Sequence, residues 1–200
     1  QRGVDNTKFT KSKKIVSDPI FPQDKFKFLI LSRLIKLKRI DLVIKSFCKI
    51  SNKNVLLMIV GDGPELNNLK YLVEKNNAND RIKFFNSTQN PEYYFNNVDT
   101  FILSSVYESF GQTILEALSA GLPIIAFNSK AKGINTATNE VIKNNLNGVL
   151  CEYTIDGLMS GIESVLNLGE NISEISIRNR NKVLKYHTWE RFCKEILNHE

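Results

Sequence analysis

Residues 100–125 carry the segment TFILSSVYESFGQTILEALSAGLPII. Its first apolar run predicts a strand at residues 99–104, and the helical spacing of the later apolar side chains predicts a helix at residues 111–120. A second apolar run follows Gly121-Leu122-Pro123 and predicts a strand at residues 123–127. Strands joined through a helix are the units of a parallel sheet, so this order indicates an α/β fold.

Two carboxylates, Glu108 and Glu116, stand eight positions apart in this segment. Glu108 is predicted to lie in the loop at the carboxyl end of its strand, where ligands bind in open α/β sheets. Gly111, Gln112 and Thr113 are predicted to offer backbone N–H groups to a phosphate at the helix start. Glu116 follows about one turn later and can reach a sugar hydroxyl. The alternative is that both glutamates are ordinary surface acids.

Strands and helices alternate along the rest of the chain. The apolar run at residues 55–60 predicts a strand that is buried on both faces. The repeated βα units predict one doubly wound parallel sheet of the Rossmann-like type. Further strands are predicted at residues 26–31, 82–85 and 148–151, and helices at residues 40–50, 64–73, 91–96, 158–166, near 183–184 and at 189–196.

The first 22 residues differ from the remainder. Pro19 and Pro22 interrupt any regular element there, and lysine and polar residues dominate before them. Residues 1–22 are therefore predicted to form a linker and residues 23–185 the folded domain. Gln1 is not an initiator methionine, which predicts that the chain is a piece of a longer protein, and no apolar signal segment follows it.

Composition narrows the class of protein. With 200 residues and 42% hydrophobic content, the chain is predicted to be a soluble globular domain with its own core. The formal net charge of +6 suits phosphate-bearing ligands or an anionic membrane surface, whereas no nucleic-acid motif is present. Three distant cysteines and two histidines predict no metal site and no disulfide, but reduced, buried thiols in a cytoplasmic protein.

Three more loops follow predicted strands. Arg33 and Lys38 in the first suit phosphate oxygens, or else belong to a solvated basic loop. Gly61 and Gly63 in the second allow a ligand or a neighbouring backbone to come close. In the third, Ser87 can face a ligand, although a cap on the next helix by Ser87 or its neighbour Thr88 is the favoured alternative. Cations, amides and carboxylates at one sheet edge together match a sugar nucleotide.

The motifs resemble those of the C-terminal, donor-binding half of GT-B glycosyltransferases of family 4, a retaining group. The resemblance runs from residues 2–9 to the helix at Trp189. The two-glutamate element with its flanking Phe-Gly and Glu-Ala pairs is the specific part, and it follows the G-D-G-P turn in the expected order. The matching segments are Ser32-Arg33-Leu34 with Lys38, Ile59–Pro64, Val98-Asp99, Ser104-Ser105 with Glu108, and Phe110-Gly111 with Glu116-Ala117.

The resemblance implies a donor that is a UDP- or GDP-linked sugar, retaining transfer of a hexose and no obligatory metal. Arg33 and Lys38 would stabilise charge on the leaving diphosphate, and Glu108 would lie near the transferred sugar. These three would be the catalytic residues. The donor-binding residues would be Gly61, Gly63, Ser87, Phe110, Gly111, Gln112, Thr113 and Glu116.

The resemblance also implies a second domain, to which residues 1–22 would connect and towards which a helix at residues 186–200 would pack. That domain would bind a glycan or a lipid-linked acceptor. A lipid-linked acceptor would place the enzyme at the inner face of the membrane. This fragment alone would not catalyse transfer. Two departures stand out: Ser32 and Arg39 replace usual glycines, and residues 129–134 replace a usual Gly-Gly loop. The alternatives are another GT-B sugar-nucleotide enzyme, such as an epimerase, or a non-catalytic binding module.

Overall fold

The computed structural model describes residues 3–10, 18–108, 111–142, 146–169 and 171–197, without the side chains at positions 192, 195 and 196. Six parallel strands form the central sheet in the order β3-β2-β1-β4-β6-β8. The predicted doubly wound α/β fold is thereby confirmed. The strands are β1 Phe26–Leu31, β2 Val55–Val60, β3 Ile82–Phe85, β4 Thr100–Leu103, β6 Ile124–Phe127 and β8 Gly148–Cys151.

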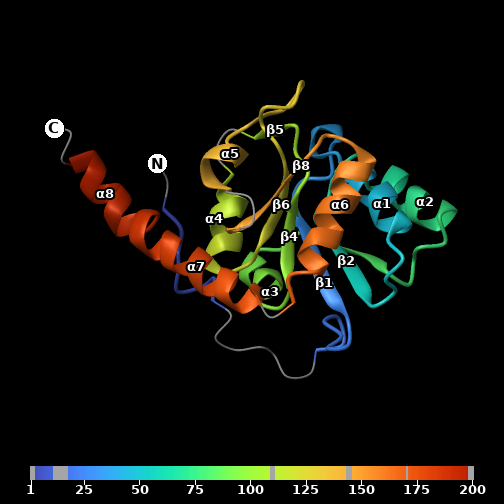
Figure 1. Ribbon diagram of the computed structural model, residues 1–200, viewed down its shortest axis with the longest axis horizontal. Helices are drawn as coiled ribbons and strands as arrows, with labels where there is room; N and C mark the ends of the chain where they lie inside the picture. Colours follow the sequence, from blue (N-terminus) through green and yellow to red (C-terminus); the bar gives the residue numbers. More distant parts are fainter. Residues whose placement is uncertain (1–2, 11–17, 109–110, 143–145, 170, 198–200) are drawn as a thin grey trace.

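Helices cover both faces of this sheet (Figure 1). One face carries α1, α2 and α6, and the other carries α3, α4 and α7. The helices are α1 Ile40–Lys49, α2 Leu66–Lys75, α3 Pro91–Phe95, α4 Gln112–Ser119, α5 Thr138–Val141, α6 Ile155–Leu166, α7 Asn171–Tyr186 and α8 Trp189–Leu197, with a short 3₁₀ helix, η1, at Lys36–Lys38.

The two-sided core explains the apolar runs in the sequence. Side chains of a strand point alternately to opposite faces, so a strand covered on both sides must be apolar at every position. In β2, Leu57 and Ile59 belong to the core beneath α1 and α6, while Leu56 and Met58 belong to the core beneath α3 and α4. All six residues of β2 are buried.

Two further strands lie outside the central sheet. β5 Tyr107–Glu108 pairs in parallel with β7 Asn135–Thr136 above the end of β4. The sequence analysis placed Glu108 in a loop and missed both strands, because two-residue strands are too short to show an alternating pattern. Their pairing ties Glu108 to Thr136.

The predicted linker contributes to the core. Val4, Phe9 and Phe21 are buried, and the backbone N–H of Val4 donates to the carbonyl of His187 at 3.0 Å. Arg180 of α7 donates to the carbonyl of Phe9 at 2.8 Å. The role of residues 1–22 as a connection between domains stays a prediction, but residues 3–10 pack against the fold as part of it.

The chain leaves this arrangement at α8, which extends from the end of α7 (Figure 1). Trp189 and Leu197 are exposed there. The three cysteines are free; Cys151 is buried and Cys48 half-buried, but Cys193 on α8 is exposed, which corrects the prediction that all three are buried. Among the described residues, no helix is both long and apolar enough to span a bilayer.

Candidate functional site

The turn after β2 shapes one wall of the site. A Cβ added at Gly61 would collide with the carbonyl oxygen of Ser32, and one added at Gly63 would collide with that of Leu34. The two glycines therefore leave room for the backbone of the loop after β1. The sequence analysis allowed either a ligand or a neighbouring backbone at this place. Leu34 N–H donates to the carbonyl of Asp62 at 2.8 Å and fixes the two loops together.

These loops surround a cavity of about 520 Å³. It lies at the carboxyl ends of β1, β2 and β3, beside the point where the strand order reverses between β1 and β4. Ligands bind at this switch point in open α/β sheets. The lining residues are Leu31, Ser32, Arg33, Val60, Gly61, Asp62, Gly63, Ser87, Thr88 and Thr113.

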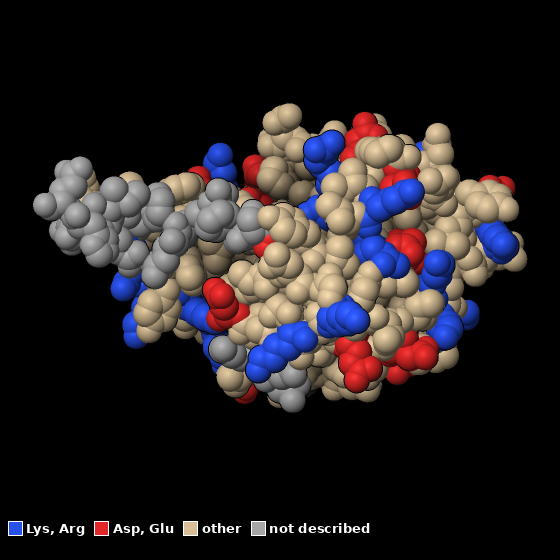
Figure 2. All heavy atoms as spheres, turned by 90° about the horizontal axis from the view of Figure 1, so that it is seen from above, with Lys and Arg blue, Asp and Glu red and all other residues tan. Residues whose placement is uncertain are grey.

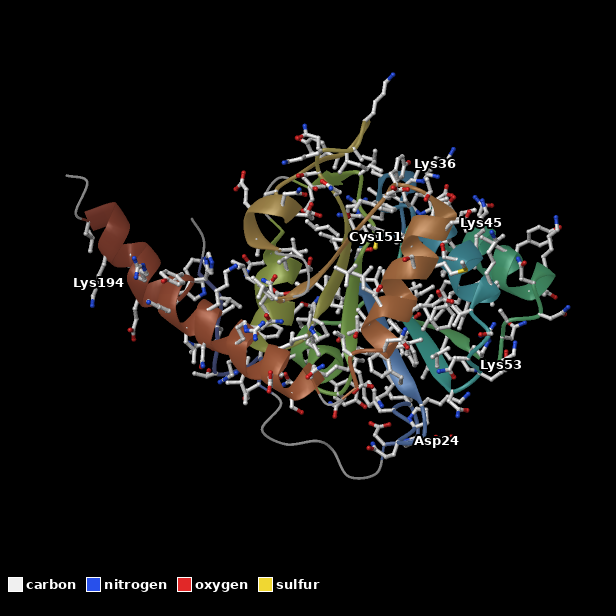
Figure 3. All side chains as sticks on the ribbon, viewed as in Figure 1. Asp24, Lys36, Lys45, Lys53, Cys151 and Lys194 are labelled. Atoms are coloured by element: carbon white, nitrogen blue, oxygen red, sulfur yellow. The ribbon has the colours of Figure 1, made fainter. Side chains whose placement is uncertain are left out.

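Basic side chains lie at this edge of the sheet, together with acidic ones. Lys36 lies at the carboxyl edge, whereas Asp24 and Lys53 lie at the opposite edge of the sheet (Figure 3). Figure 2 looks down onto the carboxyl edge and shows Lys and Arg side chains over that face, with Asp and Glu side chains among them. Arg33 is exposed at the cavity, where its guanidinium can meet an entering anion.

Lys38 and Glu108 form an ion pair, with Lys38 Nζ 2.7 Å from Glu108 Oε2. Their side chains are 19% and 23% exposed, so the pair is partly shielded from water but open to a ligand. The Oγ of Ser104 donates to the carbonyl of Lys38 at 2.6 Å, and Val106 N–H donates to the carbonyl of Leu37 at 2.9 Å. The loop after β4 thus holds η1, and with it Lys38.

The amino end of α4 faces the same region. Gly111, its N-cap, has φ 55°, a left-handed conformation that favours glycine, and no side chain in the described part of the chain caps the helix. Among the described residues, no backbone carbonyl accepts from the N–H groups of Gln112 and Thr113, so these two groups can meet an anion. Phe110, a predicted donor-binding residue, lies outside the described residues.

Glu116 lies one turn further along α4, on the same face as Thr113. Burial raises the pKa of Glu116 to about 7, an increase that a hydrogen bond from Gln112 opposes and the charge of Glu92 on α3 reinforces. Near neutral pH the carboxyl group can therefore gain or lose a proton in response to a ligand that donates hydrogen bonds to it.

The structure brings some predicted site residues together and leaves others apart. Arg33, Gly61, Gly63, Ser87 and Thr113 line one cavity. The remaining described ones, including Lys38, Glu108 and Glu116, do not line it.

The predicted helix cap on the third loop is wrong. The N-cap of α3 is Asn90, and no side-chain hydrogen bond caps the helix. Thr88 Oγ1 accepts from the N–H of Asn90 at 3.0 Å, which precedes the first helical residue, so Thr88 does not cap the helix. The sequence analysis quoted Ser104 in a matching segment but gave it no role, whereas in the structure it donates to the carbonyl of Lys38. The position of Ser104 directly after an apolar strand was the sequence feature that could have indicated this role. Among the described residues, no group of three or more His, Cys, Asp or Glu side chains is arranged to hold a metal ion.

A parallel sheet of this order with a loop-lined cavity beside its switch point defines an open α/β ligand-binding domain. A comparison with family models gives a match to "Glycosyl transferases group 1" over residues 11–182. The chain therefore belongs to the glycosyl transferases group 1 family.

Relatives and solved structures agree with this family. The O-antigen biosynthesis glycosyltransferase WclY of Escherichia coli is 35% identical over 97 residues, which are 48% of this chain and 27% of that protein. In each of eight curated relatives, the segment that matches this chain covers less than half of the relative's length.

Two solved structures show the same fold. Anabaena HepE in complex with UDP and glucose gives a TM-score of 0.84 at 18% identity, covering 98% of this chain and 54% of that one. The C-terminal domain of LpcC, a glycosyl transferase group 1 family protein of Francisella tularensis, gives a TM-score of 0.77 at 20% identity, covering 94% of this chain and 100% of that one. The chain thus has the fold of a C-terminal glycosyltransferase domain.

Proposed function

We propose that this chain is the donor-binding domain of a retaining glycosyltransferase of family 4 that uses a nucleotide-diphosphate sugar, UDP- or GDP-linked, to transfer a hexose. The observation that carries the proposal is the shared cavity beside the switch point, where Arg33, the Gly61–Gly63 turn and Thr113 at the start of α4 meet. A guanidinium and an uncapped helix start are both suited to phosphate oxygens.

In this proposal the diphosphate lies between Arg33 and the first turn of α4, with Lys38 at its sugar end. Negative charge grows on the diphosphate as the bond to the sugar breaks, and the cations stabilise that charge. Glu108, held 2.7 Å from Lys38, lies beside the transferred sugar. Glu116 accepts hydrogen bonds from the ribose hydroxyls of the nucleotide. No metal is needed, since the side chains and helix start supply the positive charge.

The acceptor and its domain belong to the proposal as well. We assign residues 1–22 to the interdomain connection, residues 23–185 to donor binding and residues 186–200 to a helix that returns towards an acceptor domain. The exposed Trp189 and Leu197 of α8 support a partner surface there. The similarity to an O-antigen biosynthesis enzyme supports a glycan or lipid-linked acceptor in polysaccharide synthesis, at the cytoplasmic face of a membrane.

Calorimetric titration of the chain with UDP and GDP tests the proposal. Wild type should bind at least one of them, and Arg33→Ala should weaken its affinity about 10-fold or more, the usual loss for a charge-assisted contact. Lys53→Ala is the matched control, because Lys53 is an exposed cation at the opposite edge of the sheet. The proposal fails if wild type binds neither nucleotide at millimolar concentration, or if the two variants behave alike.

A further inference from the structure

The junction between η1 and α1 has an unusual residue. Arg39 joins the two elements in the left-handed conformation, with φ 47° and ψ 36°. A side chain strains this conformation, and glycine avoids the strain. Among the described residues, Asn77 is the one other non-glycine with a positive φ. Strained residues of this kind persist where their surroundings hold them, and they concentrate at functional sites.

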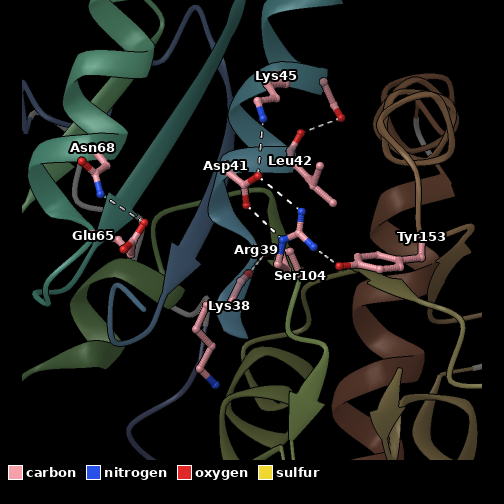
Figure 4. Close-up of polar contacts among 10 residues, drawn as sticks. Lys38, Arg39, Asp41, Leu42, Lys45, Glu65, Asn68, Ser104 and Tyr153 are labelled. Atoms are coloured by element: carbon pink, nitrogen blue, oxygen red, sulfur yellow. Dashed lines mark hydrogen bonds and ion pairs between the residues drawn. The ribbon is translucent and has the colours of Figure 1, made fainter. Parts of the chain in front are cut away.

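The side chain of Arg39 makes contacts that a glycine could not make (Figure 4). Its Nε donates to Asp41 Oδ1 at 3.2 Å, and a terminal nitrogen donates to Asp41 Oδ2 at 3.4 Å. Another terminal nitrogen donates to the hydroxyl of Tyr153, and the guanidinium carbon lies 5.2 Å from the centre of the Tyr153 ring. Arginine matches this combination of a carboxylate and an aromatic face.

These contacts cross the sheet. Arg39 and Asp41 belong to the connection after β1, whereas Tyr153 follows β8, the edge strand three places from β1 in the strand order. The Tyr153 ring in turn packs edge-on against Phe127, the last residue of β6, with ring centres 4.9 Å apart. The guanidinium therefore fastens the start of α1 to the carboxyl ends of β6 and β8.

Lys38 lies between the contacts of Arg39 and a hydrogen bond from Ser104. It directly precedes Arg39, and its carbonyl accepts the hydrogen bond from Ser104 at 2.6 Å. Its side chain points away from Arg39 in Figure 4 and ends 2.7 Å from Glu108. The contacts on both sides fix the backbone from which the Lys38 side chain starts, and the ion pair with Glu108 holds its ammonium group.

We propose that Arg39 is a positioning residue that holds Lys38 in place for the donor diphosphate and for Glu108, through its contacts with Asp41 and Tyr153. The inference rests on the proposed function for its ligand, but the Lys38–Glu108 contact can be followed without one.

The decisive variant is Arg39→Gly, which removes the side chain and accepts the backbone conformation without strain, so the chain should still fold. Calorimetry with UDP and GDP should show affinity reduced about 5- to 10-fold. Arg39→Lys should not restore it, because an ammonium keeps the charge but not the planar fork. Asn77→Gly is the matched control: it relieves the same backbone strain at the end of α2, and affinity should stay within twofold of wild type.

A double-variant cycle shows whether Arg39 acts through Lys38. Adding Arg39→Gly to Lys38→Ala should weaken nucleotide binding less than twofold further. If the losses of affinity from the two single variants multiply in the double variant, the proposal is overturned. Full affinity in Arg39→Lys would also overturn it, because the charge of Arg39 alone would then explain its effect on binding.

A ligand-free measurement separates this inference from the proposed function. The carboxyl ¹³C resonance of Glu108 should shift in Arg39→Gly in the same direction as in Lys38→Ala. If wild type binds no nucleotide but this shift is seen, the proposed function falls and the positioning role stands. If nucleotide binds but the Glu108 resonance and the affinity are both unchanged in Arg39→Gly, the positioning role falls alone.

Discussion

At the end of β2, Gly61 leaves room for the carbonyl oxygen of Ser32. Gly61→Ala should therefore push the β1 loop away and lower the free energy of unfolding by about 3 kcal/mol or more, measured by urea denaturation. Gly133→Ala is the control, because φ is +86° there but no atom lies within 4 Å of the added Cβ. It should cost only about 1 kcal/mol. Equal losses would mean that the close approach of the two loops is not what requires glycine.

Glu116 should make stability depend on pH. Its pKa is raised by burial from 4.5 to about 7 in the folded chain, so the folded state holds the proton more tightly than the unfolded chain. The stabilisation is complete below about pH 4.5 and is lost as pH rises through about 7. Between pH 5 and pH 8, wild type should lose about 1–2 kcal/mol relative to Glu116→Gln, a range reduced for the partial exposure of the side chain.

Denaturation of both proteins at several pH values measures this difference. Glu74→Gln removes an exposed carboxylate of α2 and should follow wild type at every pH. A constant gap between wild type and Glu116→Gln from pH 5 to pH 8 would show that burial does not hold a proton on Glu116.

Between elements, the hydroxyl of Ser104 joins the β4 loop to Lys38 of η1, beside the hydrogen bond from Val106 to Leu37. Ser104→Ala should lower the free energy of unfolding by about 1 kcal/mol and weaken nucleotide binding several-fold, because the carbonyl of Lys38 loses its donor. Ser46→Ala is the matched control: the one O–H of this buried serine is shared between the carbonyls of Leu42 and Ile155, each 2.8 Å from Oγ and away from the cavity. It should reduce stability similarly without changing affinity. Equal affinity losses in both variants would contradict a local effect.

The long elements could be predicted from the sequence because burial dictates their pattern. Continuous apolar runs marked the strands, and helical spacing marked α1 and α4. The short elements could not, since β5 and β7 exist through pairing between residues 107–108 and 135–136. Distant backbone contacts of this kind leave no local signal.

For the molecule as a whole, the segment at residues 3–10 acts as part of the fold. Phe9 is 5% exposed and packs edge-on against Phe95, with ring centres 5.7 Å apart. Phe9→Ala should shift the entire urea transition by about 3 kcal/mol with an unchanged slope. Tyr71→Ala, at a side chain 65% exposed, should change stability by less than about 0.5 kcal/mol. An unchanged urea transition in Phe9→Ala would show that residues 3–10 do not contribute to the stability of the fold.

The sequence predicted which residues belong to the site better than it predicted the contacts between their side chains. Parallel strands bring their carboxyl ends to one edge, which is why Arg33, Gly61, Ser87 and Thr113 could be grouped from the sequence. The bridge from Arg39 to Tyr153 could not, because it joins positions 114 residues apart through side chains alone.

The most direct test of a diphosphate site is the response of backbone amides during titration with UDP and GDP, followed by ¹H–¹⁵N NMR. The account predicts saturable shifts at Gly111, Gln112 and Thr113 with either or both nucleotides, lost in the Arg33→Ala and Lys38→Ala double variant. Unchanged spectra at millimolar concentrations of both, or shifts that persist in the double variant, would contradict it.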